Sequence, residues 1–420
     1  MVVLGELRWA ARGWTPEPTR HFAPLVRVVP IIACDRRCRV TASPLRVALV
    51  ADLLSERWPS MNLVADMLFA HLRAAGSDQS MCVDLLRPTL SNRGERLGRY
   101  VNRFWDYSRW LRKRARDFDV FHIVDHSYAH LVHVLPAGRA VVTCHDVDAF
   151  MPLVDAQVIP TRLPKTLTRY VLSGMAKSAR VTCDSLATYD EARRHNFAAA
   201  DRLVVVPLGV DPALSSVPEP AADAAIDGLL GPRRTDVVDL LHVGSCIPRK
   251  RVDVLLKVLR AVRDVDPRVR LLKAGGSLTR EQLALARALA VDEHIIQLPF
   301  LESRLLGALY RRAAVTLVTS EREGFGLPVV EALACGTPVV ATDIPVLREV
   351  GGSAAAYAPL DDTGRWREAI IACLAVHQDA VQSRRTGEDT AARFSWRSCA
   401  TAMATIYADV DRRASDARVQ

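Results

Sequence analysis

The chain has 420 residues, a length that suits two domains of ordinary size better than one compact core. Half of the residues are hydrophobic and a quarter are charged, which excludes a disordered chain and is typical of a globular protein. The 56 Lys and Arg against 47 Asp and Glu give a formal net charge of +9, which suits acidic partners such as phosphorylated ligands or an anionic membrane.

Two features argue against membrane insertion and secretion. No apolar run reaches the length that spans a bilayer, and Glu6, Arg8 and Arg12 interrupt what would be the core of a signal peptide. The nine cysteines are scattered and many lie in apolar runs, as is typical of reduced, buried thiols. Cys34 and Cys38 are spaced loosely like metal ligands, but no second pair lies nearby. We therefore expect a cytoplasmic protein.

Residues 1–43 show no sustained periodicity, and we expect them to form a loosely ordered N-terminal extension. Beyond them, short apolar runs alternate with helical patterns, the first of which covers residues 60–75. This alternation predicts βαβ units and a parallel sheet, and we assign it to a domain over residues 44–211. The predicted strands are 45–51, 81–86, 120–125, 140–146, 179–185 and 202–209.

Residues 212–236 are rich in Ala, Pro and Asp and contain no strand-like run, so we place a linker there. A second βα series defines a domain over residues 237–393, and an amphipathic helix is predicted over residues 394–420. Two parallel α/β domains in tandem predict a ligand cleft between them, because open parallel sheets bind ligands at the carboxyl ends of their strands. The predicted strands of the second series are 237–245, 269–276, 294–300, 313–320 and 337–343.

The most informative segment is SEREGFGLPVVEALACGTPVVATD, residues 320–343. Residues 323–326 form a glycine-containing turn at the end of a predicted strand. Pro328 suits the first turn of a helix, and Gly336 closes that short helix as the residue after its C-cap. The turn would present free backbone N–H groups and the positive end of a helix dipole, which together make an anion site.

Glu323 and Glu331 flank this turn and allow two interpretations. Carboxylates near a helix N-terminus are favoured electrostatically, so both can simply stabilise the helix. An ionised carboxylate is also a strong hydrogen-bond acceptor that can hold sugar hydroxyls. The two residues alone do not decide between these interpretations.

Residues 242–259, HVGSCIPRKRVDVLLKVL, contain a second candidate anion site. A strand ends at Gly244, and Arg249 and Lys250 stand at the start of the following helix, where their charges oppose the helix dipole. This placement indicates that an anion neutralises them, and both side chains suit phosphate oxygens. A solvated basic turn is the alternative.

His145 and Asp146 directly follow a predicted buried strand, so they lie at the same edge of the sheet. A lone His at such a place is often structural, but His beside Asp favours a binding or catalytic role. Residues 146–148 also spell an Asp-x-Asp pattern that can hold a metal. The same triplet recurs at 264–266 and 409–411, so the pattern is prone to chance, and we expect no required metal.

Together these segments resemble the retaining glycosyltransferases of the GT-B fold, glycosyltransferase family 4. The resemblance covers residues 45–410, and its most specific element is EGFGLPVVE, residues 323–331, followed by ALACGTPVVATD. The motifs VGSCIPRK, VTCHD, VVPLGVD and FSW support it. The resemblance implies an α/β protein with two Rossmann-like parallel-sheet domains that face each other across a cleft. It also implies that the final helix, residues 394–420, crosses back to the first domain.

The resemblance also implies a role for each matching residue. Glu323 would contact the donor sugar and stabilise the developing oxocarbenium ion, and His145 would lie near that sugar. Arg249 and Lys250 would bind the diphosphate, and Glu331 would hold the ribose hydroxyls. The remaining donor-site positions are Gly244, Ser245, Phe325, Gly326 and Leu327, and the acceptor-side positions are Asp146 and Asp52.

The implied substrates are a GDP- or UDP-linked sugar and a hydroxyl group on a glycan, a lipid-linked saccharide or a glycoside. No metal or other cofactor is implied, and the leaving phosphate would accept the proton of the acceptor. The LREVGG run, residues 347–352, favours a mannose-type donor.

Three departures from the family pattern leave alternatives open. Ser245 stands where many relatives have Arg, Leu208 stands where Asn is common, and residues 51–62 contain no glycine. A non-catalytic sugar-nucleotide-binding paralogue therefore stays possible, as does an epimerase or a phosphorylase of the same fold. A nicotinamide dehydrogenase is disfavoured because neither domain starts with G-x-G-x-x-G.

Residues 93–119 interleave Arg with Trp, Tyr and Phe. Such a helix can lie on an anionic membrane, which would place the protein peripherally on its inner face. The alternative is a surface helix whose Arg stems cover the sheet. Nucleic-acid binding is disfavoured because no recognition motif accompanies these residues.

Overall fold

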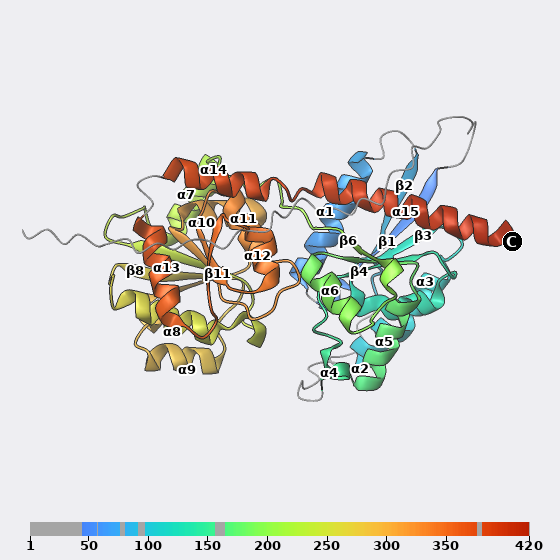
Figure 1. The fold of residues 1–420 in the computed structure, drawn as a ribbon, viewed down its shortest axis with the longest axis horizontal. Helices are drawn as coiled ribbons and strands as arrows, with labels where there is room; N and C mark the ends of the chain where they lie inside the picture. The colour runs from blue at the N-terminus through green and yellow to red at the C-terminus, as the bar shows by residue number, and fades with distance from the viewer. Residues whose placement is uncertain are drawn as a thin grey trace, which may run out of the picture. The chain divides into compact units, whose positions relative to one another are not determined.

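The computed structural model describes residues 44–56, 58–75, 80–90, 97–155, 164–375 and 380–419. They form two six-stranded parallel sheets with helices packed against them (Figure 1), which confirms the expected α/β fold class. We call the part built on strands β1–β6 the first lobe and the part built on β7–β12 the second lobe. Residues 1–43, expected to be an extension, lie outside the described residues.

The strand order of the first sheet is β2-β1-β3-β4-β5-β6. The winding reverses between β1 and β3, and open parallel sheets bind ligands at such a switch point. Each strand lies within a segment predicted from its apolar run. The strands are β1 Leu45–Val50, β2 Met81–Leu86, β3 Val120–Ile123, β4 Ala140–Cys144, β5 Arg180–Cys183 and β6 Leu203–Val205.

The strand order of the second sheet is β12-β11-β10-β7-β8-β9, with its switch point between β7 and β10. Five of these strands were predicted. Strand β12 was not predicted, because its residues AAYA include three alanines, which are poor strand formers. The strands are β7 Val238–Val243, β8 Val269–Ala274, β9 Ile295–Leu298, β10 Val315–Val318, β11 Val339–Thr342 and β12 Ala355–Ala358.

Helices connect the strands in both lobes. In the first lobe they are α1 Pro59–Ala75, α2 Leu97–Tyr100, α3 Tyr107–Arg112, α4 Met151–Val154, α5 Lys165–Lys177 and α6 Leu186–Arg194. In the second lobe they are α8 Val252–Arg263, α9 Arg280–Ala288, α10 Ser303–Arg312, α11 Leu327–Ala334, α12 Pro345–Gly351, α13 Thr363–Ala375 and α14 Ala380–Ala391.

The expected linker, residues 212–236, contains helix α7, Pro220–Leu230, which packs on α10. Two arginines of α10 fasten it, since Arg311 donates to Asp223 at 2.6 Å and Arg312 donates to Asp227 at 2.5 Å. The domain limits themselves stay a prediction.

Within the described residues the chain passes between the lobes twice, and the two passages lie side by side. Val210 N donates to Phe394 O at 3.0 Å, and Val210 forms a parallel bridge with Ser395. A methyl group on Gly209 would overlap the backbone of Trp396, so this close approach requires glycine. From Trp396 the chain enters helix α15, Trp396–Val419, which packs on α1 (Figure 1).

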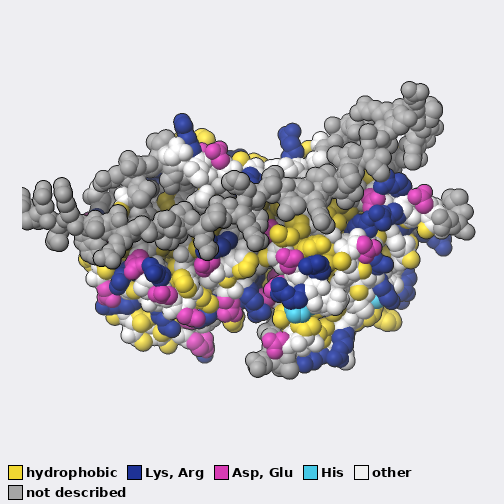
Figure 2. All heavy atoms as spheres, viewed as in Figure 1, with side chains coloured by type: hydrophobic (Ala, Val, Ile, Leu, Met, Phe, Trp, Pro, Cys, Tyr) yellow, Lys and Arg dark blue, Asp and Glu magenta, His cyan; other side chains and the backbone are white. Residues whose placement is uncertain are grey.

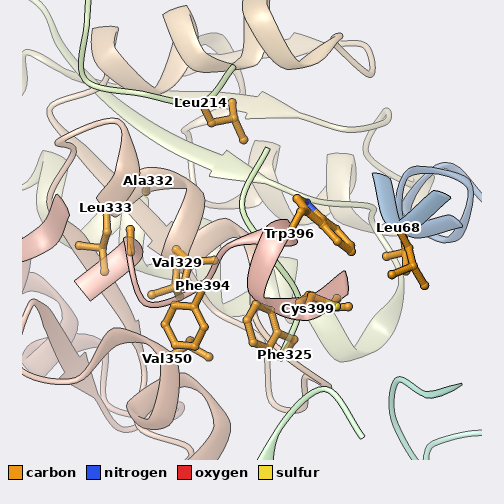
Figure 3. Close-up of a cluster of buried hydrophobic side chains, with 14 of the residues drawn as sticks. Leu68, Leu214, Phe325, Val329, Ala332, Leu333, Val350, Phe394, Trp396 and Cys399 are labelled. Carbon is orange, nitrogen blue, oxygen red and sulfur yellow. The ribbon is translucent and has the colours of Figure 1, made fainter. Parts of the chain in front are cut away.

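A cluster of buried apolar side chains surrounds these passages (Figure 3). Phe325, from the glycine-containing turn after β10, meets Phe394 edge to face, with ring centroids 5.4 Å apart. Trp396 and Cys399 of α15 belong to the same cluster, as does Leu68 of α1. Apolar contacts of Phe325 therefore help to hold the turn at residues 323–326, which belongs to the expected donor site.

The Arg- and aromatic-rich segment is helical from residue 97 to residue 112, with π-helical residues Val101–Asp106 between α2 and α3. Its inner face is tightly bound. Tyr107 Oη donates to Ala51 O at 2.7 Å, and Arg103 pairs with Glu56 at 2.9 Å. Trp105 is 66% exposed on the outer face. The segment thus has both a packed face and an exposed aromatic residue.

No helix among the described residues is long and apolar enough to cross a membrane. On the face drawn in Figure 2, basic and acidic side chains are mixed over the second lobe. The net positive charge of the chain is therefore not gathered into one patch on that part of the surface.

Candidate active site

The best candidate site lies at the switch point of the second sheet, where the segments after β7 and β10 meet. Lys250 Nζ and Arg249 Nη1 both pair with the carboxylate of Glu323, the latter at 3.0 Å. Ser320 Oγ donates to the same carboxylate at 2.7 Å. Three sequence-predicted residues are thus brought together, and Ser320 is a partner that the sequence analysis missed.

Glu323 is strongly held as an anion. Burial alone would raise the pKa of its carboxyl, but Lys250 and Arg249 outweigh burial and lower the pKa to about 2. The side chain of Glu323 is only 7% exposed, whereas that of Arg249 is 25% exposed. The arginine therefore keeps a surface that can meet a ligand.

Arg249 and Lys250 lie in a short 3-10 turn, Pro248–Lys250, rather than in the first turn of α8. Arg251 follows with φ 46°, in the left-handed region, and α8 begins at Val252. The two cations therefore pair with Glu323, and they do not belong to the first turn of α8, where their charges would oppose the helix dipole. This corrects the expectation that they stand at the start of that helix.

The N-terminus of α11 borders the same site. Gly326 is its N-cap with φ 94°, and no side chain caps the helix there. Pro328 has no N–H, and Val329 N donates to Gly326 O at 2.9 Å, so the N–H of Leu327 is the first-turn donor that no side chain caps. Phe325 is buried, whereas Leu327 is partly exposed. Gly336, with φ 72°, follows the C-cap residue Cys335, as the sequence predicted.

Glu331 projects from α11 into a buried place. Tyr310 Oη donates to Glu331 Oε2 at 2.8 Å. Burial raises the pKa of this carboxyl to about 7, while Tyr310 and nearby Lys250 pull it downward. Glu331 thus lies near the Lys250 charge, yet it makes none of the direct contacts that Glu323 makes.

Gly244 directly follows β7 and lies beside Lys250, since a methyl group on this glycine would lie 3.7 Å from Lys250 Cε. Its carbonyl oxygen accepts a hydrogen bond from Lys273, a lysine that is fully buried beneath it. His242 lies under the same glycine. It donates from Nδ1 to Leu317 O at 3.0 Å, and its buried Nε2 has no partner among the described residues. Ser245 follows Gly244 and is partly exposed.

His145 lies at the end of β4 in the first lobe, where both of its ring nitrogens are engaged. Nδ1 meets Asp184 Oδ2 at 2.6 Å, and Nε2 donates to Val124 O at 2.7 Å. Burial would lower the pKa of the imidazole, but Asp184 raises it to about 10, so the ring is a cation at neutral pH. Its side chain therefore has no free nitrogen in this conformation.

Asp52 and Asp125 follow β1 and β3, at the switch point of the first sheet. Burial, and then the charge of Asp125, raise the pKa of Asp52 well above its usual value. The pKa of Asp125 is lowered to about 2, because His126 and His145 outweigh its burial. Asp52 is therefore the member of this pair with the higher pKa, and its Oδ2 is buried without a partner among the described residues.

Asp146 and Asp148 lie beside the cations of the second lobe. Asp146 Oδ1 accepts from the backbone N–H of Asp148 at 3.0 Å. Asp148 lies 3.2 Å from Arg322 Nη1 and 3.8 Å from Arg249 Nε. Burial and Asp146 raise the pKa of Asp148 to about 6. The Asp-x-Asp triplet was considered only as a metal pattern, and its second aspartate proves to be an ion-pair partner.

The glycine-containing turn of the second lobe docks on the ends of β4 and β5. Ser185 Oγ donates to Gly324 O at 2.6 Å, and Thr188 Oγ1 donates to the same oxygen at 3.2 Å. A methyl group on Gly324 would overlap His145 O. The close packing of these two segments therefore requires glycine at this position.

Among the described residues, no group of three or more His, Cys, Asp or Glu side chains could hold a metal ion. The expectation that no metal is required stays a prediction.

Family models match both lobes. The model described as "Glycosyl transferases group 1" matches residues 232–369. The model described as "Glycosyltransferase Family 4" matches residues 64–214. The two matches fall on different halves of the chain and together include all of the predicted site residues except Asp52.

Relatives of similar sequence carry the name D-inositol 3-phosphate glycosyltransferase. The protein of Segniliparus rotundus is 31% identical over 254 residues, which is 58% of this chain and 56% of the relative. That of Xylanimonas cellulosilytica is 35% identical over 287 residues, or 64% and 66% of the two chains. The match thus spans between half and two thirds of these relatives.

Solved structures share the fold at low sequence identity. Sucrose-phosphate synthase of Thermosynechococcus elongatus matches with a TM-score of 0.70 and 19% identity, over 87% of this chain and 99% of that one. Anabaena HepE, solved in complex with UDP and glucose, matches with a TM-score of 0.67 and 16% identity, over 87% and 99%. These likenesses show that the chain shares the fold of those proteins.

Proposed function

Because the chain belongs to the family 4 glycosyltransferases and has their GT-B fold, we propose that it transfers a sugar from a nucleoside diphosphate sugar to a hydroxyl group. The transfer retains the anomeric configuration. One observation carries this proposal: Arg249 and Lys250 converge on Glu323 beside the uncapped N-terminus of α11. Two cations and the N-terminus of a helix suit a diphosphate, and the carboxylate suits the hydroxyls of the sugar.

In this proposal the diphosphate lies against Arg249 and Lys250, where it displaces Asp148 from Arg249. Cleavage of the anomeric bond leaves growing negative charge on that diphosphate. The two cations and the helix N-terminus stabilise this charge more in the transition state than in the ground state, which is what accelerates the reaction. Each such charge-assisted hydrogen bond is worth about 1.5–3 kcal/mol.

Glu323, an anion at neutral pH, accepts hydrogen bonds from the donor sugar and opposes the positive charge of the oxocarbenium ion. Glu331 holds the ribose, and the backbone N–H groups of residues 325–327 contact the sugar or the phosphate. No side chain of this chain is assigned as the base. The engagement of both His145 nitrogens supports proton transfer to the leaving phosphate instead.

The acceptor approaches from the first lobe, near Asp146 and Asp52, and supplies a hydroxyl of a glycan, a lipid-linked saccharide or a glycoside. UDP and GDP are the candidate nucleotides. A structural neighbour that binds UDP and glucose supports a UDP-linked donor. No metal ion or other cofactor takes part in the proposed reaction.

A thermal-shift screen with UDP- and GDP-linked sugars, followed by measurement of nucleoside diphosphate release with candidate acceptors, tests the function. We expect stabilisation by one nucleotide class and release that needs an acceptor. NMR of the product identifies the anomer. Stabilisation without release for any acceptor would favour a non-catalytic binding protein, and an inverted product would disprove retention.

We also propose that residues 97–112 contact an anionic membrane at its inner face. The exposed Trp105 supports this, because an aromatic ring beside arginines anchors a helix at a lipid interface. Vesicles that contain phosphatidylserine should bind the wild-type chain, and added salt should weaken this binding, as measured by sedimentation. The Trp105→Ser variant should bind less than wild type. Equal sedimentation with neutral and anionic vesicles would disprove the contact.

A further inference from the structure

Helix α6 of the first lobe begins against a helix of the second lobe. In its first turn, the backbone N–H groups of Leu186 and Ala187 donate to the two carboxylate oxygens of Glu349, at 2.8 Å and 3.2 Å. Glu349 belongs to α12, and α12 packs on α6. The N–H of Thr188 donates at 3.1 Å to Oγ of Ser185, the N-cap of the helix. The first three N–H groups of α6 therefore all have acceptors, and a side chain of the other lobe accepts from two of them.

The same end of α6 contacts the turn at residues 323–326. Gly324 O accepts from Ser185 Oγ at 2.6 Å and from Thr188 Oγ1 at 3.2 Å. Both of these residues are buried, 0% and 2% exposed, so each hydroxyl needs a partner inside the protein. Within the described part of the chain, these two side chains supply the hydrogen bonds to this oxygen. The direction of the Gly324 carbonyl thus depends on the first lobe.

Gly324 needs this support because it has no side chain of its own. A methyl group there would lie 1.7 Å from His145 O, so only glycine fits. Glycine has little conformational preference, and hydrogen bonds therefore select the orientation of the peptide group that follows it. That group is planar and trans, so its N–H, which belongs to Phe325, points away from the carbonyl and hence away from α6. The two hydroxyls thus orient the Phe325 N–H and restrict the backbone next to Glu323.

We propose that Ser185 is a positioning residue for the sugar transfer, because it orients the peptide group that carries the Phe325 N–H. Glu349, in turn, keeps α6 in place for this contact. The inference rests on the proposed function, which assigns contacts with the donor to Glu323 and to this N–H. In this role Ser185 and Glu349 act through the turn and not on the donor itself. A misplacement of about 1 Å can lower a rate about 100-fold, whereas the cations that bind the diphosphate belong to another segment. Loss of Ser185 should therefore lower turnover and leave nucleotide affinity nearly unchanged.

The test compares the loss of two helix caps. Ser185→Ala removes the cap of α6, and Asp362→Ala removes the side chain that accepts from Arg365 N in the first turn of α13. Both variants should lower the melting temperature, as loss of a cap does. Only Ser185→Ala should lower kcat, by about tenfold to 100-fold. Its affinity for UDP or GDP, whichever wild type binds, should change by less than about threefold in calorimetry. Ser185→Thr, which keeps the hydroxyl, should restore kcat.

Two further substitutions keep the test informative if Ser185→Ala does not fold. Thr188→Val removes the longer hydrogen bond to Gly324 O and keeps the backbone N–H that Ser185 caps. It should lower kcat by about twofold to tenfold, as expected for one hydrogen bond between neutral groups. Glu349→Ala removes the acceptor of two N–H groups and should also lower kcat, with Glu349→Gln between it and wild type. Glu368→Ala, at an exposed acid of α13, is the matched control.

Turnover within about twofold of wild type in both Ser185→Ala and Thr188→Val would overturn the positioning role and leave the proposed function intact. Parallel losses of kcat and nucleotide affinity would also overturn it, because they would show that Ser185 only maintains the fold of the site. Wild-type protein that binds neither UDP nor GDP, or that never releases the diphosphate from a bound donor, would overturn the proposed function and this inference together.

Discussion

The two lobes use their charged side chains differently. In the second lobe, Arg249 and Lys250 share one carboxylate, and the side chain of Arg249 stays a quarter exposed. In the first lobe, both ring nitrogens of His145 form hydrogen bonds inside the protein, one with Asp184 and one with Val124 O. The second lobe therefore keeps charges that can exchange partners with a ligand, whereas the first lobe keeps charges that hold the fold.

Loss of the His145 side chain should have the largest effect, because its charge holds the fold of the first lobe. His145→Gln leaves the carboxylate of Asp184, a residue 2% exposed, without its cation. Breaking a buried pair in this way should lower the free energy of unfolding by about 3–5 kcal/mol, as measured by urea denaturation. The double variant His145→Gln/Asp184→Asn should recover much of the loss. A loss within about 0.5 kcal/mol, as at ordinary surface sites, would contradict a structural role.

The pH dependence of unfolding identifies the cause of that effect. The pKa of His145 is raised from 6.5 to about 10 in the folded protein. Its stabilisation is therefore fully present below pH 6.5 and is lost as the pH rises toward 10. The contribution of His145 to the slope of the free energy of unfolding against pH is at most about 1.4 kcal/mol per pH unit. This contribution should vanish in the double variant.

The second lobe should respond in catalysis rather than in stability. Glu323→Gln and Lys250→Ala should each lower turnover by about 100-fold or more, because each removes a charge that acts on the transition state. The measurement is nucleoside diphosphate release by folded protein, judged by circular dichroism. Glu321→Gln is the matched control, because this neighbouring acid pairs with Arg251 instead. Turnover near wild type in Glu323→Gln would remove this residue from the mechanism.

Glu331 should make donor binding depend on pH. Its pKa is raised from 4.5 to about 7, so the carboxylate that accepts the ribose hydroxyls forms as the pH rises. The KM of a nucleotide sugar, whose diphosphate does not titrate in this range, should fall by about fivefold to tenfold between pH 6 and pH 8, in line with one hydrogen bond to a charged group. Glu331→Gln should flatten the profile. Tyr310→Phe, which removes a hydrogen bond to the carboxylate, should shift the inflection to higher pH.

Asp148 should show the smallest effect, because it only competes with the ligand for Arg249. Asp148→Asn should tighten the binding of UDP or GDP by about twofold to fivefold at pH 7.5, as expected for a partly exposed ion pair. At pH 5 the two proteins should bind equally, because the pKa of Asp148 is about 6 and wild type is then protonated. Asp361→Asn, at an acid that is 88% exposed, is the calorimetric control. Weaker binding at pH 7.5 would show that Asp148 aids the ligand.

Local features of the candidate site could be predicted from the sequence. The turn before α11, its proline and the closing Gly336 follow from φ preferences and capping, which act over a few residues. Apolar runs located all strands but β12. The convergence of Arg249, Lys250 and Glu323 followed from parallel strands ending at one edge of a sheet, together with the family resemblance.

Contacts between distant segments could not be predicted in this way. Nothing local in the sequence shows that Tyr310 reaches Glu331, that Val124 O meets the second nitrogen of His145, or that Asp148 faces Arg322. These contacts depend on how helices and loops pack across the sheets, and each joins residues that are unremarkable in their own segments.

Helix α15 has a consequence for the order in which the protein can be made. Tyr407 of this helix is fully buried, bonds His122 of β3 at 2.7 Å and shares a core with Met403 and Val410. Residues from the far end of the sequence thus complete the interior of the lobe that begins at β1. The ribosome synthesises the second lobe before it synthesises α15. During that time the apolar surface of the first lobe that α15 later covers stays exposed. Any factor that shields nascent chains would act on that surface of the first lobe during this interval.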